Sequence, residues 1–153
     1  MITNKLSAVS FQRRREVSLS DDIKTALEDD EALMTLLTGG IFNEVEEINR
    51  QNTPGAFDVN GEIQPCALIK LGVETKTGPH ARSVRTPFRI YFYQRQGYDM
   101  IDPAKELVFN ILNDQQIGAR VWNIEYGSEI NQQRDQALDC ALESQVWNAI
   151  RNR

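Results

Sequence analysis

The sequence lacks the residue clusters on which most enzymes and metalloproteins depend. It has one histidine, His80, and two cysteines, Cys66 and Cys140, which are far from a CxxC spacing. No serine or cysteine lies directly beside His80, so we interpret it as an exposed loop residue and not as a catalytic base. The two cysteines lie in apolar runs, and we expect buried reduced thiols. The sequence therefore predicts no metal site.

Phosphate-binding and hydrolytic motifs are also missing. Gly39-Gly40 is not followed by the Lys-Ser/Thr of a P-loop, and HExxH and GxSxG do not occur. Acidic pairs such as Asp21-Asp22 and Glu46-Glu47 are adjacent in sequence, which directs their side chains apart. The acidic run 28–31 lacks the spaced oxygen ligands of an EF-hand and fits helix caps and a solvated face. We predict no catalytic residues, no cofactor and no enzymatic activity.

Long hydrophobic runs are absent as well. No segment approaches the ~18 apolar residues of a membrane span, and the first residues lack the apolar core of a signal peptide. We therefore expect an intracellular protein without a membrane partner. The length of 153 residues, with 41% hydrophobic and 25% charged residues, predicts one globular domain. Residues 1–18 show no periodicity and are interpreted as an extended arm, which leaves 19–153 as the domain.

Charge is segregated along the chain, although the net charge is only −5. The arm is basic, residues 19–62 are strongly acidic, residues 66–98 are basic, and the remainder is mildly acidic. An acidic chain is a poor general binder of nucleic acid, because affinity for phosphate scales with the cations presented. Alternating blocks of opposite charge fit self-association better, since a basic patch can face an acidic patch of the next copy.

The segment 85–112 is the predicted centre of the fold. Phe88, Ile90 and Phe92 alternate with polar residues, which predicts a strand over 85–95. Gln96-Gly97 ends this strand, and Asp102 followed by Pro103 predicts the N-cap and first position of a helix. The helix has an apolar stripe formed by Ala104, Leu107, Val108, Ile111 and Leu112.

The flanking segments complete an α+β domain. Ser20 is predicted to open one bent helix or two short ones, with Asp29 or Asp30 capping the second, and Ile41-Phe42 to begin a short edge strand. A strand from Pro65 to Glu74 is expected to pair as a hairpin with 85–95 across a long loop, 75–84. The segment 120–126 also alternates, and 128–136 is interpreted as a polar connection.

The last segment, 137–150, fits both periods. Leu138, Cys140, Leu142, Val146 and Ile150 match a strand, and an equally good helical stripe exists. We favour a strand, because it would complete the sheet by pairing with 120–126. The prediction is a four-stranded, mainly antiparallel sheet (β-β-α-β-β) with an N-terminal helix or helix pair and a central helix on one face.

These pieces together resemble the tail terminator or tail completion proteins of long-tailed bacteriophages. The resemblance covers about residues 20–150. Its most specific parts are a helix end of the form ALxxLL-GG-I(F/Y), matched by Ala32 to Phe42, and the strand–turn–helix RTPFRIYFYQRQGYD–PAKELVFNIL. The arm lies outside the match.

The resemblance implies a structural virion protein that forms a ring, hexameric in this family, on the end of the tail tube. Such a ring ends tail polymerisation and joins the tail to the head or neck. The implied partners are other copies of the chain, the tail tube protein, neck or connector proteins, and a tail sheath if the tail is contractile. DNA would pass through the ring without specific binding, and assembly would take place in the cytoplasm of the bacterial host.

We predict that basic residues make the contacts between subunits and with partners. These are Arg13, Arg14 and Arg15 in the arm and Lys76, His80, Arg82, Arg85 and Arg89 in the second basic block. Their expected counterparts are the acidic blocks 28–31 or 44–47 of a neighbour. The alternatives are another neck or head–tail joining protein, or a small nucleic-acid-binding module that uses the same basic residues.

Overall fold

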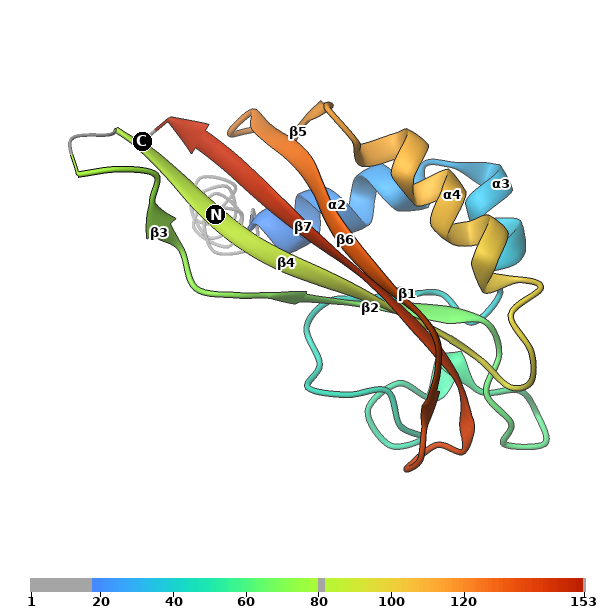
Figure 1. Ribbon diagram of the computed structural model, residues 1–153. Coiled ribbons are helices and arrows are strands. Elements are labelled where there is room, and N and C mark those ends of the chain that lie inside the picture. The colour runs from blue at the N-terminus through green and yellow to red at the C-terminus, as the bar shows by residue number, and fades with distance from the viewer. Residues whose placement is uncertain (1–17, 80–81, 153) are drawn as a thin grey trace, which may run out of the picture.

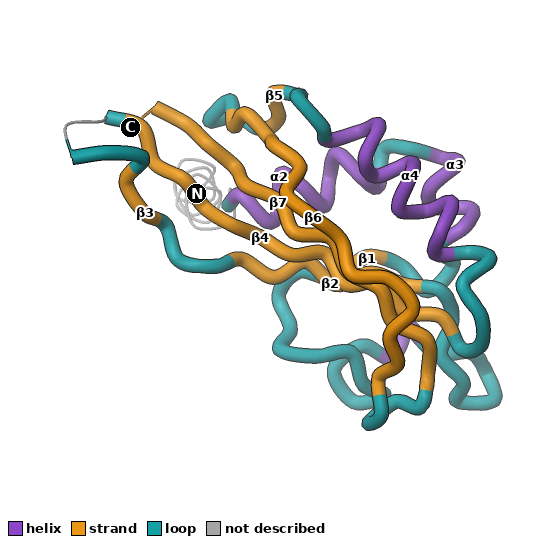
Figure 2. Tube along the Cα trace, viewed as in Figure 1, coloured by secondary structure: helices purple, strands orange, loops and turns teal. Residues whose placement is uncertain are grey.

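The computed structural model describes residues 18–79 and 82–152 of the chain. It shows an α+β fold in which a long twisted sheet carries helices α2, α3 and α4 on one face (Figures 1 and 2). The strands are β1 (Ile41–Phe42), β2 (Cys66–Leu71), β3 (Thr75–Lys76), β4 (Ser83–Gln94), β5 (Gln116–Ile117), β6 (Trp122–Asp135) and β7 (Cys140–Asn152). Within the described ranges, no helix is long and apolar enough to cross a membrane.

The sheet has seven strands where the sequence predicted four. Its order is β1-β2-β4-β7-β6-β5, and β3 pairs with β4 outside this path. The four predicted strands are the long ones, β2, β4, β6 and β7, and the other three are two residues each. The short edge strand predicted at Ile41-Phe42 is confirmed as β1, although it was not counted among the four. The two-residue strands β3 and β5 carry almost no periodic signal and were not predicted. The predicted β2–β4 and β6–β7 pairings are both confirmed.

The first two helices are α2 (Leu19–Glu28) and α3 (Glu31–Leu36). Ser18, and not Ser20, is the N-cap of α2, and its hydroxyl accepts a hydrogen bond from the Asp21 amide at 3.2 Å. Asp30 caps α3 by accepting a hydrogen bond from the Leu33 amide at 2.8 Å. Of the two predicted caps, Asp29 and Asp30, the second is therefore the one used. The acidic run 28–31 thus contains a helix end and a helix cap.

Helix α4 (Ile101–Leu112) does not use its predicted cap. Asp102 lies inside the first turn, and the side chain of Gln94 at the end of β4 caps the helix instead. Its Oε1 accepts from the amides of Met100 and Ile101 at 3.0 and 3.1 Å. A cap supplied by another element leaves no local sequence pattern, which explains why this prediction was wrong.

Apolar residues cover both faces of the sheet, in two separate clusters. The larger cluster lies under the three helices and is centred on Phe88, Ile90, Trp147 and the apolar stripes of α2 and α4. The smaller cluster lies on the opposite face, where the irregular segment 43–65 with its 3₁₀ turn (Pro54–Ala56) covers one end of the sheet (Figure 1). Cys66 and Cys140 are buried and free in this second cluster, as predicted.

Strand β6 is much longer than predicted, because 128–135 is strand and not a polar connection. It pairs with β7 as far as Asp135↔Cys140 and makes a projecting hairpin, with irregular register between Tyr126 and Ser128 and between Ile130 and Gln133. Most of its outer residues are exposed. An exposed hairpin arm has no apolar alternation, so periodicity missed it.

Strand β7 was predicted correctly as a strand. The residues of β7 that pack in the main core, however, are odd-numbered, whereas the prediction was based on the even-numbered ones. Trp147 and Ala149 pack under the helices, with Glu143 and Gln145 buried in the same alternating series. Of the even-numbered series that suggested the strand, Leu138, Cys140 and Leu142 belong to the second cluster. A strand with a covered face on each side carries two overlapping apolar patterns.

Candidate functional site

Three of the predicted basic residues of the second block, Lys76, Arg82 and Arg85, lie at one end of the sheet. We call this end the wing and define it as β3 together with residues 82–87. Figure 1 shows the wing at the end of the sheet remote from α3 and α4. In the wing, Thr75 pairs with Arg85 and Lys76 with Val84. Because successive strand residues point to opposite faces, Lys76 and Arg85 lie on opposite faces. The structure therefore does not bring all the predicted cations into one patch.

Arg82, Arg85 and Lys76 are exposed, whereas Arg89 is partly buried farther along β4. His80 and the three arginines of the arm lie outside the described residues.

Arg89 borders a shallow groove of about 230 Å³ on the face opposite the helices. The register places it between Lys70 of β2 and Val146 of β7. Lys70 Nζ donates to the Glu46 carbonyl oxygen at 2.7 Å, and Arg89 Cζ lies 5.8 Å from the centroid of the Tyr91 ring. Lys70 is thus tied to the loop that covers the second cluster, while Arg89 lies beside an aromatic ring.

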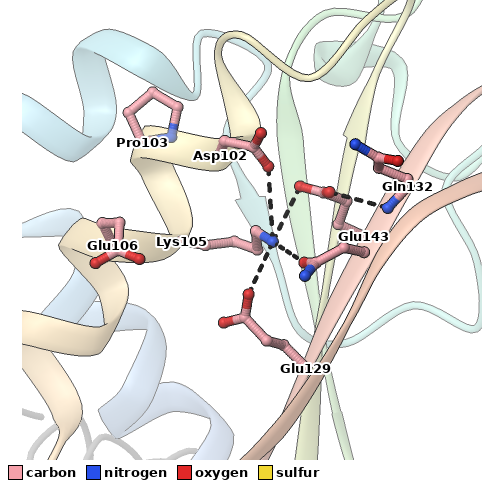
Figure 3. A pocket seen from close by; sticks show the side chains of 8 residues that line it. Asp102, Pro103, Lys105, Glu106, Glu129, Gln132 and Glu143 are labelled. Atoms are coloured by element: carbon pink, nitrogen blue, oxygen red, sulfur yellow. Dashed lines mark hydrogen bonds and ion pairs between the residues drawn. The ribbon is translucent and has the colours of Figure 1, made fainter.

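A second pocket, of about 390 Å³, lies between the start of α4 and the projecting hairpin (Figure 3). Its centre is Lys105, only 5% exposed. Lys105 Nζ lies 3.1 Å from a carboxylate oxygen of Glu129, 3.1 Å from one of Glu143 and 3.7 Å from one of Asp102. It also donates to the Asn131 side chain. We call Lys105, Asp102, Glu129 and Glu143 the Lys105 cluster.

Backbone and amide groups extend this cluster across three elements. The Gln132 amide donates to Glu143 at 3.0 Å, and Gln145 Nε2 donates to the Lys105 carbonyl at 3.2 Å. Gln145 Oε1 in turn accepts from the Trp147 indole at 3.2 Å. The network joins α4 to β6 and β7 at the base of the projecting hairpin.

Burial and pairing shift the pKa values in the Lys105 cluster in different directions. Burial raises the pKa of Glu143, which is 1% exposed, and the hydrogen bonds from Gln132 and Lys105 only partly oppose this. Burial also acts to raise the pKa of Glu129, but its hydrogen bonds to Lys105 and Gln145 outweigh burial and lower it. Burial acts to lower the pKa of Lys105, and the hydrogen bonds to Glu129 and Glu143 reverse this and raise it.

The arrangement suits a structural ion-pair network better than catalysis. The residues lining the pocket carry four carboxyl groups and one ammonium group, with no thiol, hydroxyl nucleophile or imidazole. In the described part of the chain, no three His, Cys, Asp or Glu side chains are grouped so that they could hold a metal ion. The pocket presents an excess of negative charge at the base of the hairpin.

Sequence patterns did not predict this cluster. Lys105 follows Ala104 in a helix predicted to be amphipathic, and Glu143 stands in the last segment, for which a strand was favoured over a helix. One sequence feature could have indicated the cluster. Glu143, Gln145 and Trp147 occupy every second position of β7, and all three are buried. Polar residues at buried strand positions indicate paired groups, because an unpaired buried charge is too costly.

Comparison with known proteins places the fold and leaves the family open. No protein-family model matches the chain, and no curated protein matches it. Among solved structures, one similar chain belongs to the virion of a native gene transfer agent (GTA) particle, with a TM-score of 0.62 and 14% sequence identity. The alignment covers 89% of this chain and 96% of that chain. The two chains therefore share an α+β fold over almost their whole lengths.

Proposed function

We propose that this protein is a structural component of a phage-like virion, with no enzymatic role. The observation that carries the proposal is the shared fold with a chain of the gene transfer agent virion, which extends over 96% of that chain. An alignment over almost the whole of both chains favours a similar role. An alignment confined to a common submotif would favour it less. The missing catalytic and metal-binding motifs of the sequence point in the same direction.

Within the virion, we propose that the chain forms a ring, hexameric by resemblance, that caps the tail tube. The ring would stop tail polymerisation and join the tail to the head or neck. A ring needs two different surfaces that meet head to tail, with no shared active site. The exposed cations of the wing and the exposed acidic side chains at the α2–α3 corner, Glu28, Asp29 and Glu31, offer such a pair of surfaces.

The first test is the state of the purified protein. Light scattering should give a closed oligomer, and negative-stain images should show rings with a central channel. If the chain stays monomeric alone, the same measurement is made after mixing with tail tubes of the virus that carries it, since some rings close only on a partner. Protein that forms no ring in either condition would contradict the proposal.

A second test asks where the protein acts. Inactivating its gene should give tails of uncontrolled length that remain separate from filled heads, and expression of the intact gene should restore both length and joining. Tails of normal length attached to heads would exclude the capping role. Normal-length tails that fail to join heads would indicate a different neck component, and strong salt-dependent DNA binding would favour a nucleic-acid-binding module.

A further inference from the structure

The turn between β5 and β6, residues 118–121, contains a β-branched residue in the left-handed region. Val121 has a φ of 55°, and Gly118, at the start of the same turn, has a φ of 79°. Glycine adopts this conformation without a steric penalty, whereas a branched Cβ collides with its own backbone there. The Val121 amide closes the turn by donating to the Gly118 carbonyl oxygen at 3.1 Å. Val121 therefore strains the turn that it closes.

The chain itself provides little to offset this strain. Val121 is 56% exposed and belongs to neither apolar cluster. Among the residues that the structure describes, the other non-glycine residues with positive φ are Asp114, Gln132 and Asp139, which are polar and unbranched at Cβ. Strained conformations persist where function requires them, so an exposed and strained valine indicates a contact that the isolated subunit lacks.

The β5–β6 turn lies at the same end of the sheet as the wing. Asn123, near the start of β6, and Arg85 of the wing pair with Ile150 from its two sides, and Figure 1 shows the turn beside the end of β7. Basic side chains that are exposed or half-buried gather at this end: Lys76, Arg82, Arg85, Arg120 and Arg151. The surface around the turn is therefore mainly basic, with Asp22 and Glu74 as acidic residues.

We propose that Val121 is an apolar anchor in the contact between two copies of the chain, and that it packs against the α2–α3 corner of the next copy. This inference rests on the proposed ring and specifies which surfaces meet in it. Burial of a valine side chain in a contact is favourable, and this gain offsets the strain in the assembled state only. The isolated subunit is therefore less stable than it would be with glycine at this position, whereas the ring is more stable.

The α2–α3 corner fits the surface around Val121 in charge and in position. Asp29 and Glu31 are exposed there, and Ala32 is an exposed apolar residue next to Glu31. These carboxylates suit Arg120 and the wing cations, because opposite charges across a contact orient the two partners. Figure 1 shows α3 and the wing remote from each other, so a contact between them is head to tail, which is the arrangement that a ring requires.

Substitution of Val121 should change subunit stability and assembly in opposite directions. Val121→Gly relieves the strain, so the melting temperature of the dilute subunit should rise by about 2–4 °C. The same variant loses the apolar contact, so the protein concentration required for half-maximal ring formation should rise by about tenfold or more. Val121→Asn tolerates the left-handed region without the added flexibility of glycine, and should also weaken assembly. Circular dichroism measures the melting temperature, and light scattering over a dilution series measures assembly.

Gln132→Gly is the matched control, since it replaces a left-handed residue (φ 52°) in the projecting hairpin and should leave the assembling concentration unchanged. If both Val121 variants assemble like the natural sequence, Val121 is not an anchor, although the ring itself stands. Weaker assembly of the glycine variant alone would show an effect of flexibility and would also exclude an apolar anchor. If the natural sequence forms no ring, alone or on tail tubes, the proposed ring and this contact both fail.

Cross-linking tests which surface Val121 meets. One preparation carries Ala119→Cys, at an exposed position in the same turn, and another carries Ala32→Cys, while Cys66 and Cys140 are buried. A short bis-maleimide should link two chains only when the two preparations are mixed under ring-forming conditions. Rings that form in the mixture without this product would exclude the α2–α3 corner as the partner surface.

Discussion

At the scale of single residues, Lys105 is a buried charged side chain that depends on its ion-pair partners. It is 5% exposed and lies among three carboxylates, of which Glu143 is itself 1% exposed. An ion pair buried this deeply contributes little compared with an apolar pair of the same shape. The loss of one partner is nevertheless costly, because a charge is left buried without compensation.

Replacing Lys105 with Met should therefore destabilise the domain by about 3–5 kcal/mol near neutral pH. Urea unfolding followed by circular dichroism measures the change. The matched variant Lys105→Met with Glu143→Gln removes the stranded charge and should recover a large part of the loss. Equal destabilisation in the single and double variants would show that Glu143 is not the group left uncompensated.

The same variant should have a particular pH dependence. Burial already raises the pKa of Glu143, and removing Lys105 raises it further, with Asp102 and Glu129 as the remaining charged neighbours. A folded-state carboxyl with a raised pKa binds protons more readily than the unfolded one, so stability falls as pH rises above about 4.3. The loss in Lys105→Met should thus be smaller at pH 5 than at pH 8. A loss that is the same at both values would contradict this assignment.

At the scale of elements, helix α4 depends on strand β4 for its first turn. Gln94 is 6% exposed, and its Oε1 accepts from two amides at the start of the helix. The strand and the helix are therefore joined by a side-chain cap as well as by their shared core.

Replacing Gln94 with Ala should destabilise the domain by about 1–2 kcal/mol, because two amides lose their acceptor. Thermal unfolding measures the loss, and faster amide exchange at Met100 and Ile101 should locate it. Gln96→Ala is the control, since that side chain is exposed two residues away. If both variants have the same stability, the cap has no energetic role.

At the scale of the whole molecule, the way in which the two faces of the sheet are covered determines which surfaces are left for other subunits. Helices cover one face, the segment 43–65 covers part of the other, and the wing extends beyond both (Figure 1). The exposed cations on both sides of the wing can approach another subunit without disturbing either core. We therefore expect substitutions at the proposed ring contacts to leave folding unchanged.

Reversing Arg82 and Arg85 to Glu should weaken ring assembly by at least about tenfold in the concentration required, because favourable charge contacts become repulsive. Light scattering over a dilution series measures this, and an unchanged melting temperature confirms folding. Lys76→Glu tests which face of the wing makes the ring contact, since Lys76 and Arg85 lie on opposite faces of the sheet. Unchanged ring formation by the Arg82/Arg85 variant would exclude the wing as the interface.

The sequence by itself determined the fold class and the long elements. Alternation in 85–95 and the apolar stripe of 104–112 specified β4 and α4, because period two and period 3.6 each place apolar side chains on one face. Local capping chemistry found Asp30, and the apolar context of Cys66 and Cys140 was enough to predict buried thiols. The segregation of charge into blocks is likewise a property of the amino-acid order alone.

Only the tertiary structure decided the rest, since it depends on which distant residues meet. Gln94 caps a helix from another element, and Lys105 finds Glu129 and Glu143 from two strands far along the chain. The pairing of β3 with β4 separates Lys76 from Arg85, although the sequence groups them together. Periodicity in the sequence predicts which face of a single helix or strand is apolar. A site is formed where the faces of several elements meet, and the register between those elements is set by packing.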